Sequence, residues 1–199
     1  MEAKYQIIYA DPPWSYNDKL GNRRDLGSAT SAYETQGIEW IKGLPIKDLS
    51  DENCVLFLWA VSPLLNEAFE VIKSWGFKYK TVAFVWSKEY KNQTPVSNMG
   101  RWTMGNVEMC LLATKGAPKR VSKNVKQLVI DLRTGHSRKP DEVRRRIVQL
   151  MGDLPRIELF ARDDGSKNLF NENRLDGWSA WGNEVKSDIE LKTHAKTLL

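Results

Sequence analysis

Short apolar runs without polar alternation are the feature that most restricts the fold of this chain. A strand that reads as an uninterrupted run of Ile, Val, Leu and Phe has both of its faces covered, as in α/β proteins. Runs of this kind predict strands at residues 5–10, 54–59, 80–86, 107–113, 127–130 and 156–161.

Helix signals stand between these runs. Pro63 opens a segment with helical apolar spacing that Gly76 closes, and Pro140 opens a second one that Gly152 follows. Proline suits the first helical turn and glycine follows the last. A third helix is predicted over residues 37–49. The alternation of strands and helices predicts an α/β fold, with a mostly parallel sheet and helices on both faces.

Length and charge bound the organisation of the chain. A chain of 199 residues is expected to form one domain, because this length supports a single sizeable core. We place that domain at residues 1–185, followed by a tail at residues 186–199. Lys and Arg number 30 against 25 Asp and Glu, for a net charge of +5, which favours a polyanionic partner without identifying one.

The cysteine, histidine and N-terminal patterns argue against a disulfide framework, a metal site and a secreted or membrane protein. Cys54 and Cys110 lie inside apolar runs and are interpreted as reduced core residues. The 2 histidines lie far apart, so no metal site is predicted. The chain begins with polar residues and holds no long apolar segment, which predicts a cytoplasmic protein without a membrane partner.

The tetrapeptide Asp11-Pro12-Pro13-Trp14 directly follows the first predicted strand, at the sheet edge where open α/β sheets bind ligands. The exocyclic amine of adenine or cytosine is a poor nucleophile, because its lone pair is delocalised into the ring. Acceptors opposite its N–H groups draw the nitrogen towards tetrahedral geometry, and the Asp11 carboxylate and Pro12 carbonyl can serve. Two successive prolines leave carbonyls unopposed by local donors, and Trp14 offers a face on which a flipped base can stack.

The tetrapeptide also has a purely structural interpretation. A carboxylate followed by two prolines is a common turn signal, and Trp14 would then be a buried residue at the end of a strand. Taken alone, the motif is about as consistent with that turn as with an amine-binding site. Other motifs of the chain have to decide between the two.

Polar segments between the predicted elements are long for a compact domain, which is typical of functional or disordered loops. They cover residues 15–36, 87–106, 114–126 and 162–177. Basic, amide and aromatic side chains in the second and third are suited to phosphates and base faces. Lys119 and Arg120 in the third are therefore candidate substrate contacts, although a solvated surface is the simpler interpretation of an isolated basic loop.

Further motifs follow the tetrapeptide in a fixed order: residues 56–59 (LFLW), 74–77 (SWGF), 100–102 (GRW), 108–111 (EMCL), 115–116 (KG), 136–142 (HSRKPDE), 157–162 (IELFAR) and 177–185 (GWSAWGNEV). With them, residues 5–185 resemble the MT-A70 family of S-adenosylmethionine-dependent N6-adenine methyltransferases, particularly its small bacterial and phage-type members. Each motif is weak alone, but the shared order is specific.

The resemblance implies a Rossmann-like methyltransferase fold in which the catalytic motif precedes the cofactor-binding segments. The family's catalytic tetrapeptide maps onto Asp11, Pro12, Pro13 and Trp14 with its acid intact. The implied cofactor is S-adenosylmethionine. The residues implied to bind it are Asp11, Lys139, Glu158, Arg162, Asn183 and Glu184.

Individual roles follow from the same resemblance. Lys139 is expected to meet the carboxylate of the cofactor's methionine moiety. Glu158 needs a partner if it is buried, and it could pair with Arg162 or accept hydrogen bonds from cofactor hydroxyls. The loops that hold the three remaining candidates resemble active-site loops and are expected to contact the target base; these candidates are Tyr33, Arg101 and Trp102.

The predicted function is methyl transfer from S-adenosylmethionine to N6 of adenine in DNA. Methylation of adenine in RNA and N4 methylation of cytosine in DNA remain open, because the same acceptors can hold either amine. A catalytically silent nucleic-acid-binding subunit is a further alternative, disfavoured by the retention of Asp11 and Lys139 together. The predicted partner is a nucleic acid, DNA before RNA, and the predicted assembly is a monomer or a homodimer.

Overall fold

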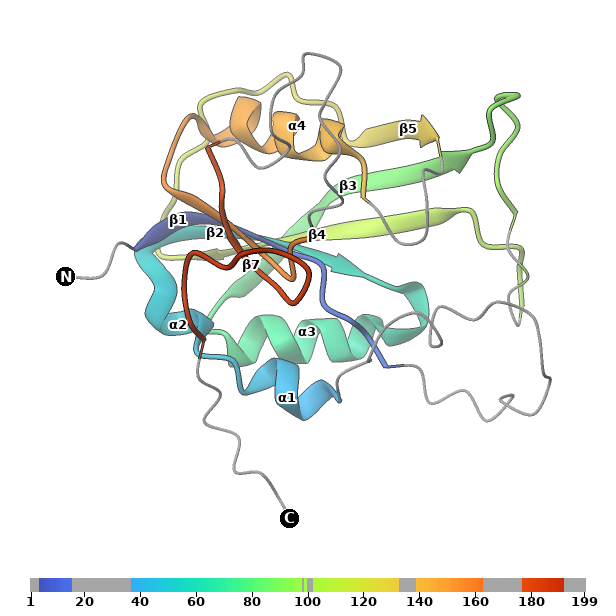
Figure 1. Cartoon of the computed structure of the whole chain (residues 1–199). Coiled ribbons are helices and arrows are strands. Elements are labelled where there is room, and N and C mark those ends of the chain that lie inside the picture. Colours follow the sequence, from blue (N-terminus) through green and yellow to red (C-terminus); the bar gives the residue numbers. More distant parts are fainter. Residues whose placement is uncertain are drawn as a thin grey trace.

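The computed structural model describes residues 4–15, 37–97, 99, 102–132, 139–162 and 177–191. Its strands are β1 (Tyr5–Ala10), β2 (Ser50–Ala60), β3 (Lys78–Glu89), β4 (Val107–Lys115), β5 (Leu128–Leu132), β6 (Arg156–Leu159) and β7 (Ser179–Trp181). They form a 7-stranded sheet in the order β5-β3-β4-β2-β1-β6-β7 (Figure 1). Within this described sheet, β4 runs antiparallel to its neighbours β2 and β3, and all other pairs are parallel.

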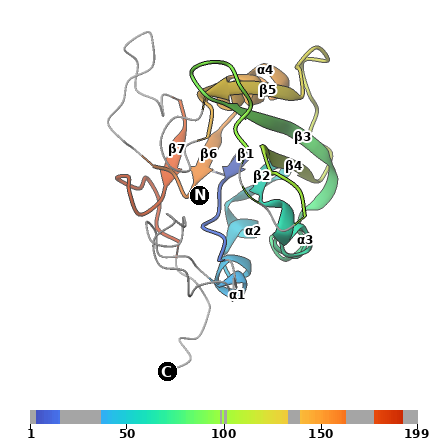
Figure 2. The same cartoon turned by 90° about the vertical axis from the view of Figure 1, so that its right-hand side faces the viewer.

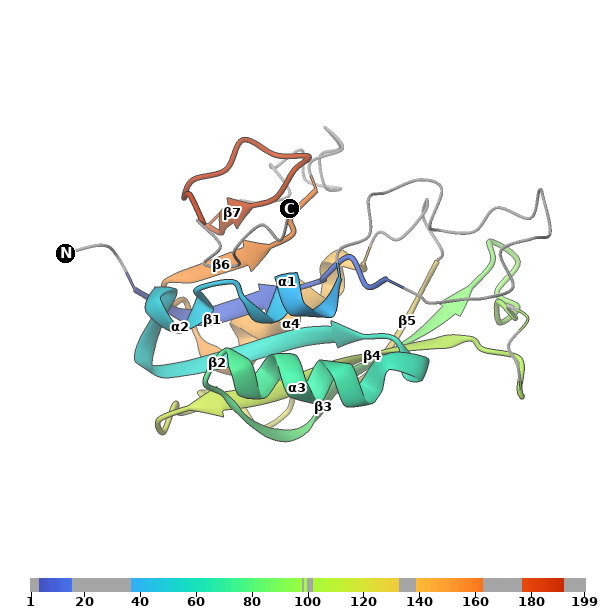
Figure 3. The same cartoon turned by 90° about the horizontal axis from the view of Figure 1, so that it is seen from below.

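Helices cover both faces of the sheet. They are α1 (Ile38–Lys42), α2 (Ile46–Leu49), the 3-10 turn η2 (Ser62–Leu64), α3 (Leu65–Ser74) and α4 (Asp141–Met151). Figures 1 and 2 show α4 over one face and α1 and α3 over the other, and Figure 3 shows α1 and α3 in front of the sheet. The predicted α/β class, with its mostly parallel sheet and helices on both faces, is confirmed.

Alternate residues of the central strands enter two different hydrophobic clusters. Ile8 and Leu56 belong to the cluster beneath α1 and α3, whereas Ile7 and Phe57 belong to the cluster beneath α4. Because successive side chains of a strand point to opposite faces, both faces of β1 and β2 are buried. This double burial is the physical reason why the strands read as uninterrupted apolar runs.

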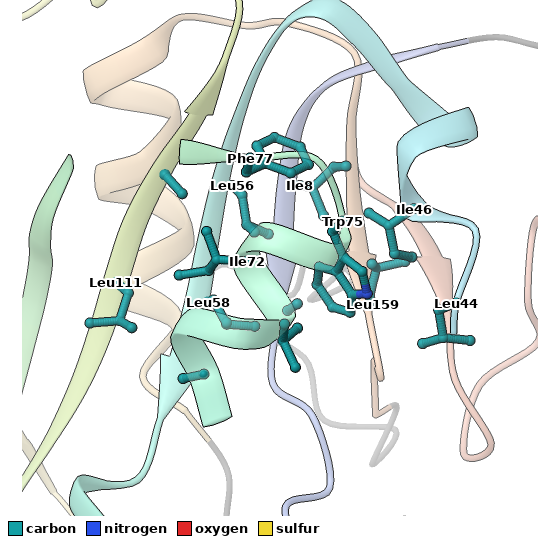
Figure 4. Close-up of a cluster of buried hydrophobic side chains, with 14 of the residues drawn as sticks. Ile8, Leu44, Ile46, Leu56, Leu58, Ile72, Trp75, Phe77, Leu111 and Leu159 are labelled. Carbon is teal, nitrogen blue, oxygen red and sulfur yellow. The ribbon is translucent and has the colours of Figure 1, made fainter. Parts of the chain in front are cut away.

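The cluster between the sheet and α3 is closed by Trp75, one residue after that helix (Figure 4). Trp75 is fully buried, and its indole N–H donates a 2.9 Å hydrogen bond to the carbonyl of Ile41 in α1. The bond satisfies a polar group that would otherwise be costly to bury. It also ties α1 to the end of α3.

Two predicted helices differ from the structure, and one strand was not predicted. The helix predicted over residues 37–49 is divided into α1 and α2 around Gly43 and Pro45, because proline cannot continue the hydrogen-bond ladder. Pro63 opens only η2, and α3 begins at Leu65. No strand was predicted for β7, whose 3 residues are too few to carry a periodic pattern.

The topology of the chain singles out the carboxyl ends of β1 and β6. From β1 the chain proceeds to β2 on one side, and from β6 it proceeds to β7 on the other. In open α/β sheets, ligands bind outside the carboxyl ends of strands at such a reversal. Asp11 directly follows β1 at this point. Strand alternation places its side chain with Ile7 and Tyr9, on the face that α4 covers.

Candidate active site

Asp11 and Lys139 form an ion pair at the carboxyl end of β1. The Lys139 ammonium donates a 2.7 Å hydrogen bond to Oδ2 of Asp11, and Lys139 is only 7% exposed. Lys139 immediately precedes Pro140 and α4, so this helix sets its position. The backbone N–H of Asp11 donates to the Leu159 carbonyl of β6 over 3.4 Å. The carboxylate is therefore fixed where β1 and β6 meet.

Glu108 extends this ion pair. No role in the site was predicted for this residue from the sequence. Its Oε2 lies 3.2 Å from the Lys139 ammonium, and its Oε1 pairs with Lys88 at the end of β3. Asp11, Lys139, Glu108 and Lys88 thus form a charge chain of alternating sign. A carboxylate within the apolar start of β4 was the signal that could have found Glu108, because such groups are rarely buried without a partner.

The charge chain favours the ionised forms of its two central members, Lys139 and Glu108. Burial acts to lower the pKa of Lys139, but the Asp11 and Glu108 carboxylates outweigh it and raise that pKa above its ordinary value. Burial acts to raise the pKa of Glu108, but Lys139 and Lys88 outweigh it and lower that pKa. Each ion is therefore stabilised by its oppositely charged neighbours.

The aromatic ring of Trp59, in β2, packs against the Lys139 ammonium. The Lys139 ammonium lies 5.4 Å from the centroid of the Trp59 ring, within the range of a cation–π attraction. The Trp59 indole N–H donates a 2.6 Å hydrogen bond to the hydroxyl oxygen of Tyr9. Lys139 thus spans β2, with one carboxylate partner from β1 and the other from β4.

Trp14 is packed inside the molecule. It is 7% exposed, and its indole N–H donates a 3.0 Å hydrogen bond to the Trp59 carbonyl. The structural interpretation, in which Trp14 is a buried residue at a strand end, agrees directly with this placement. Stacking of a base on Trp14 stays a prediction.

The Pro12 carbonyl has a local donor, contrary to the reasoning from two successive prolines. The backbone N–H of Trp14 donates to it over 2.8 Å, across a tight turn. Proline removes only its own N–H, so the donor comes from the first residue after the pair. A carbonyl oxygen has two lone pairs, and the second can still accept an N–H group.

Glu158 pairs with Arg144 of α4. Its two carboxylate oxygens accept 2.6 Å hydrogen bonds from Nε and Nη2 of Arg144, and both side chains are buried. The suggested pairing of Glu158 with Arg162 is wrong. Strand alternation turns Glu158 towards α4, whereas Arg162 lies beyond β6 and forms a β-bridge and a 3.8 Å side-chain contact with Glu184.

The turns after β6 and β7 lie against each other. A Cβ atom on Gly182 would come within 2.3 Å of the Ala161 carbonyl oxygen, so only glycine fits there. Asn183 and Glu184 follow it and are exposed. Phe160, directly after β6, has a φ of 61°, which is unfavourable for a bulky residue. Strained backbone of this kind gathers at functional sites.

The predicted substrate residues fall into three groups: one is exposed, two lie far from the charge chain, and two lie outside the described residues. Trp102 is described and is 97% exposed. Lys119 and Arg120 are exposed at the opposite end of the sheet, because Ala117 bonds to Asn53 near the start of β2 and Val121 bonds to the last turn of α4. Tyr33 and Arg101 lie outside the described residues.

The described residues hold no group of three or more His, Cys, Asp and Glu side chains that could bind a metal ion. Across the same residues, no helix has the length and apolar character needed to cross a membrane. Cys54 and Cys110 are buried free thiols, as predicted. Burial raises the pKa of Cys54 to about 12.

Comparison with known proteins gives a family and named relatives. The MT-A70 family matches residues 5–184. The type II methyltransferase M.MunI of a Mycoplasma species is 36% identical over 210 residues, covering 97% of this chain and 83% of that protein. The human N(6)-adenosine-methyltransferase catalytic subunit METTL3 is 26% identical over 92% of this chain. A putative N(6)-adenosine-methyltransferase MT-A70-like protein of Medicago truncatula is 26% identical over the same share.

The two groups of relatives differ in length. The chain spans only 28% of human METTL3 and 27% of the Medicago protein, but most of M.MunI. The family match covers nearly the whole chain, including the Asp-Pro-Pro-Trp motif and every described strand. The chain belongs to the MT-A70 family of methyltransferases, as its ordered motifs predicted.

Proposed function

We propose that this protein transfers a methyl group from S-adenosylmethionine to N6 of adenine in DNA. The observation that carries the proposal is the Asp11 carboxylate, held by Lys139 where β1 and β6 meet. That place is the ligand-binding edge of an open α/β sheet. Membership of the MT-A70 family supports methyl transfer, and the similarity to M.MunI over most of both chains supports DNA as the substrate.

Asp11 is suited to orient and polarise the target amine. Oδ2 is held by Lys139, which leaves Oδ1 to accept one amine N–H, and the second lone pair of the Pro12 carbonyl can accept the other. Acceptors fixed before the reaction favour the tetrahedral, positively charged nitrogen that develops during transfer. The Asp11–Lys139 pair keeps one oxygen fixed, so the amine meets a preorganised acceptor.

The side chains present fit the proposed cofactor. The Lys139 ammonium has three donors and uses two for Asp11 and Glu108, so a third can meet a carboxylate. Asn183 and Glu184, exposed beside the end of β6, offer acceptors for ribose hydroxyls. When bound, S-adenosylmethionine would supply a methyl group on a sulfonium. The amine nitrogen would attack the methyl carbon in line while the carbon–sulfur bond breaks, so that the neutral thioether leaves and the methylated nitrogen gives up a proton to solvent. Proximity and orientation then supply much of the rate.

The target base has to leave its stack to reach Asp11, because the carboxylate is recessed and only 21% of its side chain is exposed. An extruded base presents its amine edge to acceptors in a pocket. We assign Trp102 to the contact with nucleic acid, since its fully exposed ring is suited to stacking. Lys119 and Arg120 lie too far from Asp11 to touch the same base, and their proposed contact is with the phosphate backbone.

A transfer assay tests the proposal. Purified protein is incubated with methyl-labelled S-adenosylmethionine and, separately, unmethylated duplex DNA, single-stranded DNA and RNA, and the nucleosides are then analysed. We expect N6-methyldeoxyadenosine from DNA. Label in N4-methylcytosine, or in RNA alone, would assign the same site to the corresponding alternative substrate. No transfer to any substrate, with no cofactor binding by calorimetry, would establish the silent-subunit reading instead.

A further inference from the structure

A second buried ion pair lies beside the charge chain, on the same face of the sheet. Arg144 and Glu158 have side chains that are 5% and 8% exposed, and two parallel hydrogen bonds of 2.6 Å join them. Such a bidentate pair fixes orientation as well as distance. It connects the first half of α4 to β6, the strand that adjoins β1.

The pair is not needed merely to bury α4. Val143, Ile147 and Met151 already pack that helix into the hydrophobic cluster beneath it. A buried ion pair in an apolar interface is weak evidence for added stability, because desolvation offsets most of the attraction. The planar guanidinium, however, fixes both the position of α4 along the helix axis and its rotation about that axis. The more direct consequence of this ion pair is therefore the placement of α4.

Contacts run from Arg144 to the charge chain by two routes. Along α4, Nη1 of Arg144 bonds to Oδ1 of Asp141 over 2.7 Å, in the first helical turn after Lys139 and Pro140. Across the sheet, the guanidinium lies 5.7 Å from the Tyr9 ring centroid. Tyr9 in turn accepts the hydrogen bond of Trp59, whose ring supports Lys139.

We propose that Arg144 is a positioning residue whose ion pair with Glu158 fixes the first turn of α4, and thereby holds Lys139 against Asp11. Glu158 then serves the site through Arg144, because both of its oxygens are taken by the guanidinium. The inference rests on the proposed roles of Asp11 and Lys139. Its first test does not depend on methyl transfer.

The first test is lysine footprinting without cofactor. Folded protein is given a short pulse of an amine-reactive ester, and modification of Lys139 is quantified by mass spectrometry. Arg144→Lys keeps a charge for Glu158 but loses the fork, so we expect Lys139 to become several-fold more reactive. Arg145→Lys is the matched control, since Arg145 is 76% exposed on the same helix. Equal protection of Lys139 in both variants would overturn the proposal, and Glu158→Gln repeats the test if Arg144→Lys does not fold.

The second test is a double-mutant cycle on kcat/KM. We expect Arg144→Lys to lower kcat/KM about 10–100-fold, because small misplacements in an active site have effects of this size. In a Lys139→Ala background the same change should cost less than about two-fold, since residues that act through each other are not additive. Equal costs in both backgrounds would show that Arg144 acts independently of Lys139. A wild-type protein without transferase activity would refute the proposed function and leave the footprinting result to stand by itself.

Discussion

Lys139 bonds to the Asp11 carboxylate over 2.7 Å, although the two residues are 128 positions apart in the chain. The contact joins the end of β1 to the start of α4, and Glu108 holds the same ammonium from the other side. A lysine with two carboxylate partners and one further donor can fix the Asp11 carboxylate and meet a cofactor carboxylate together. This double role gives the site its first testable property.

Lys139→Ala should weaken cofactor binding. Loss of one charge-assisted hydrogen bond is worth about 1.5–3 kcal/mol, which corresponds to a rise in Kd of about one to two powers of ten. Calorimetric titration with S-adenosylmethionine, without DNA, measures the effect. Lys119→Ala is the control, because Lys119 lies at the opposite end of the sheet and should leave the Kd unchanged. An unaltered Kd in Lys139→Ala would contradict the assignment.

Glu108→Gln should lower stability in a pH-dependent way. The folded-state pKa of Glu108 lies below its ordinary value of 4.5, so its ion pairs stabilise the protein above that pH. This contribution is lost as the pH falls through the lowered pKa. We expect the variant to lose about 1–3 kcal/mol of unfolding free energy at neutral pH, and less at acidic pH. Urea unfolding at several pH values measures this, and a difference that did not shrink on acidification would exclude the ion pairs as its source.

Trp14→Phe should lower the stability of the protein while keeping an aromatic ring at this position. Phenylalanine keeps an aromatic face but loses the N–H that bonds to the buried Trp59 carbonyl. We expect the unfolding free energy to fall by about 1–2 kcal/mol, because that carbonyl is left without its donor. Trp102→Phe, at a 97% exposed position, should be neutral by the same urea titration. Equal stability of both variants would remove the anchoring role.

The fold was largely predictable because strand burial leaves a strong imprint on sequence. The apolar runs at 5–10 and 107–113 mark β1 and β4, and the helix after Pro140 is α4. The runs do not record direction, so nothing in them showed that β4 is antiparallel. β7 was missed because its few residues carry no period, and the break at Gly43 and Pro45 was missed because apolar spacing resumes beyond it.

The site was predictable only in part, since ion pairing depends on which strands become neighbours. Asp11 and Lys139 were identified from motifs, and the structure brings them together. Glu108 joins them because β4 lies next to β2, which no local pattern records. Glu158 was expected either to pair with Arg162 or to accept hydrogen bonds from cofactor hydroxyls, but strand alternation turns it under α4 towards Arg144.

The most direct measurement compares the wild-type protein with Asp11→Asn on unmethylated duplex DNA, with N6-methyldeoxyadenosine quantified by mass spectrometry. Asparagine keeps the size of the side chain but removes the charge that holds Lys139 and polarises the amine. We predict N6-methyldeoxyadenosine from the wild-type protein and a fall in kcat of at least about 10²–10³ in the variant, the effect of losing a preorganised electrostatic contact. Undiminished turnover by a folded Asp11→Asn protein would contradict the assignment of Asp11 as the catalytic acceptor.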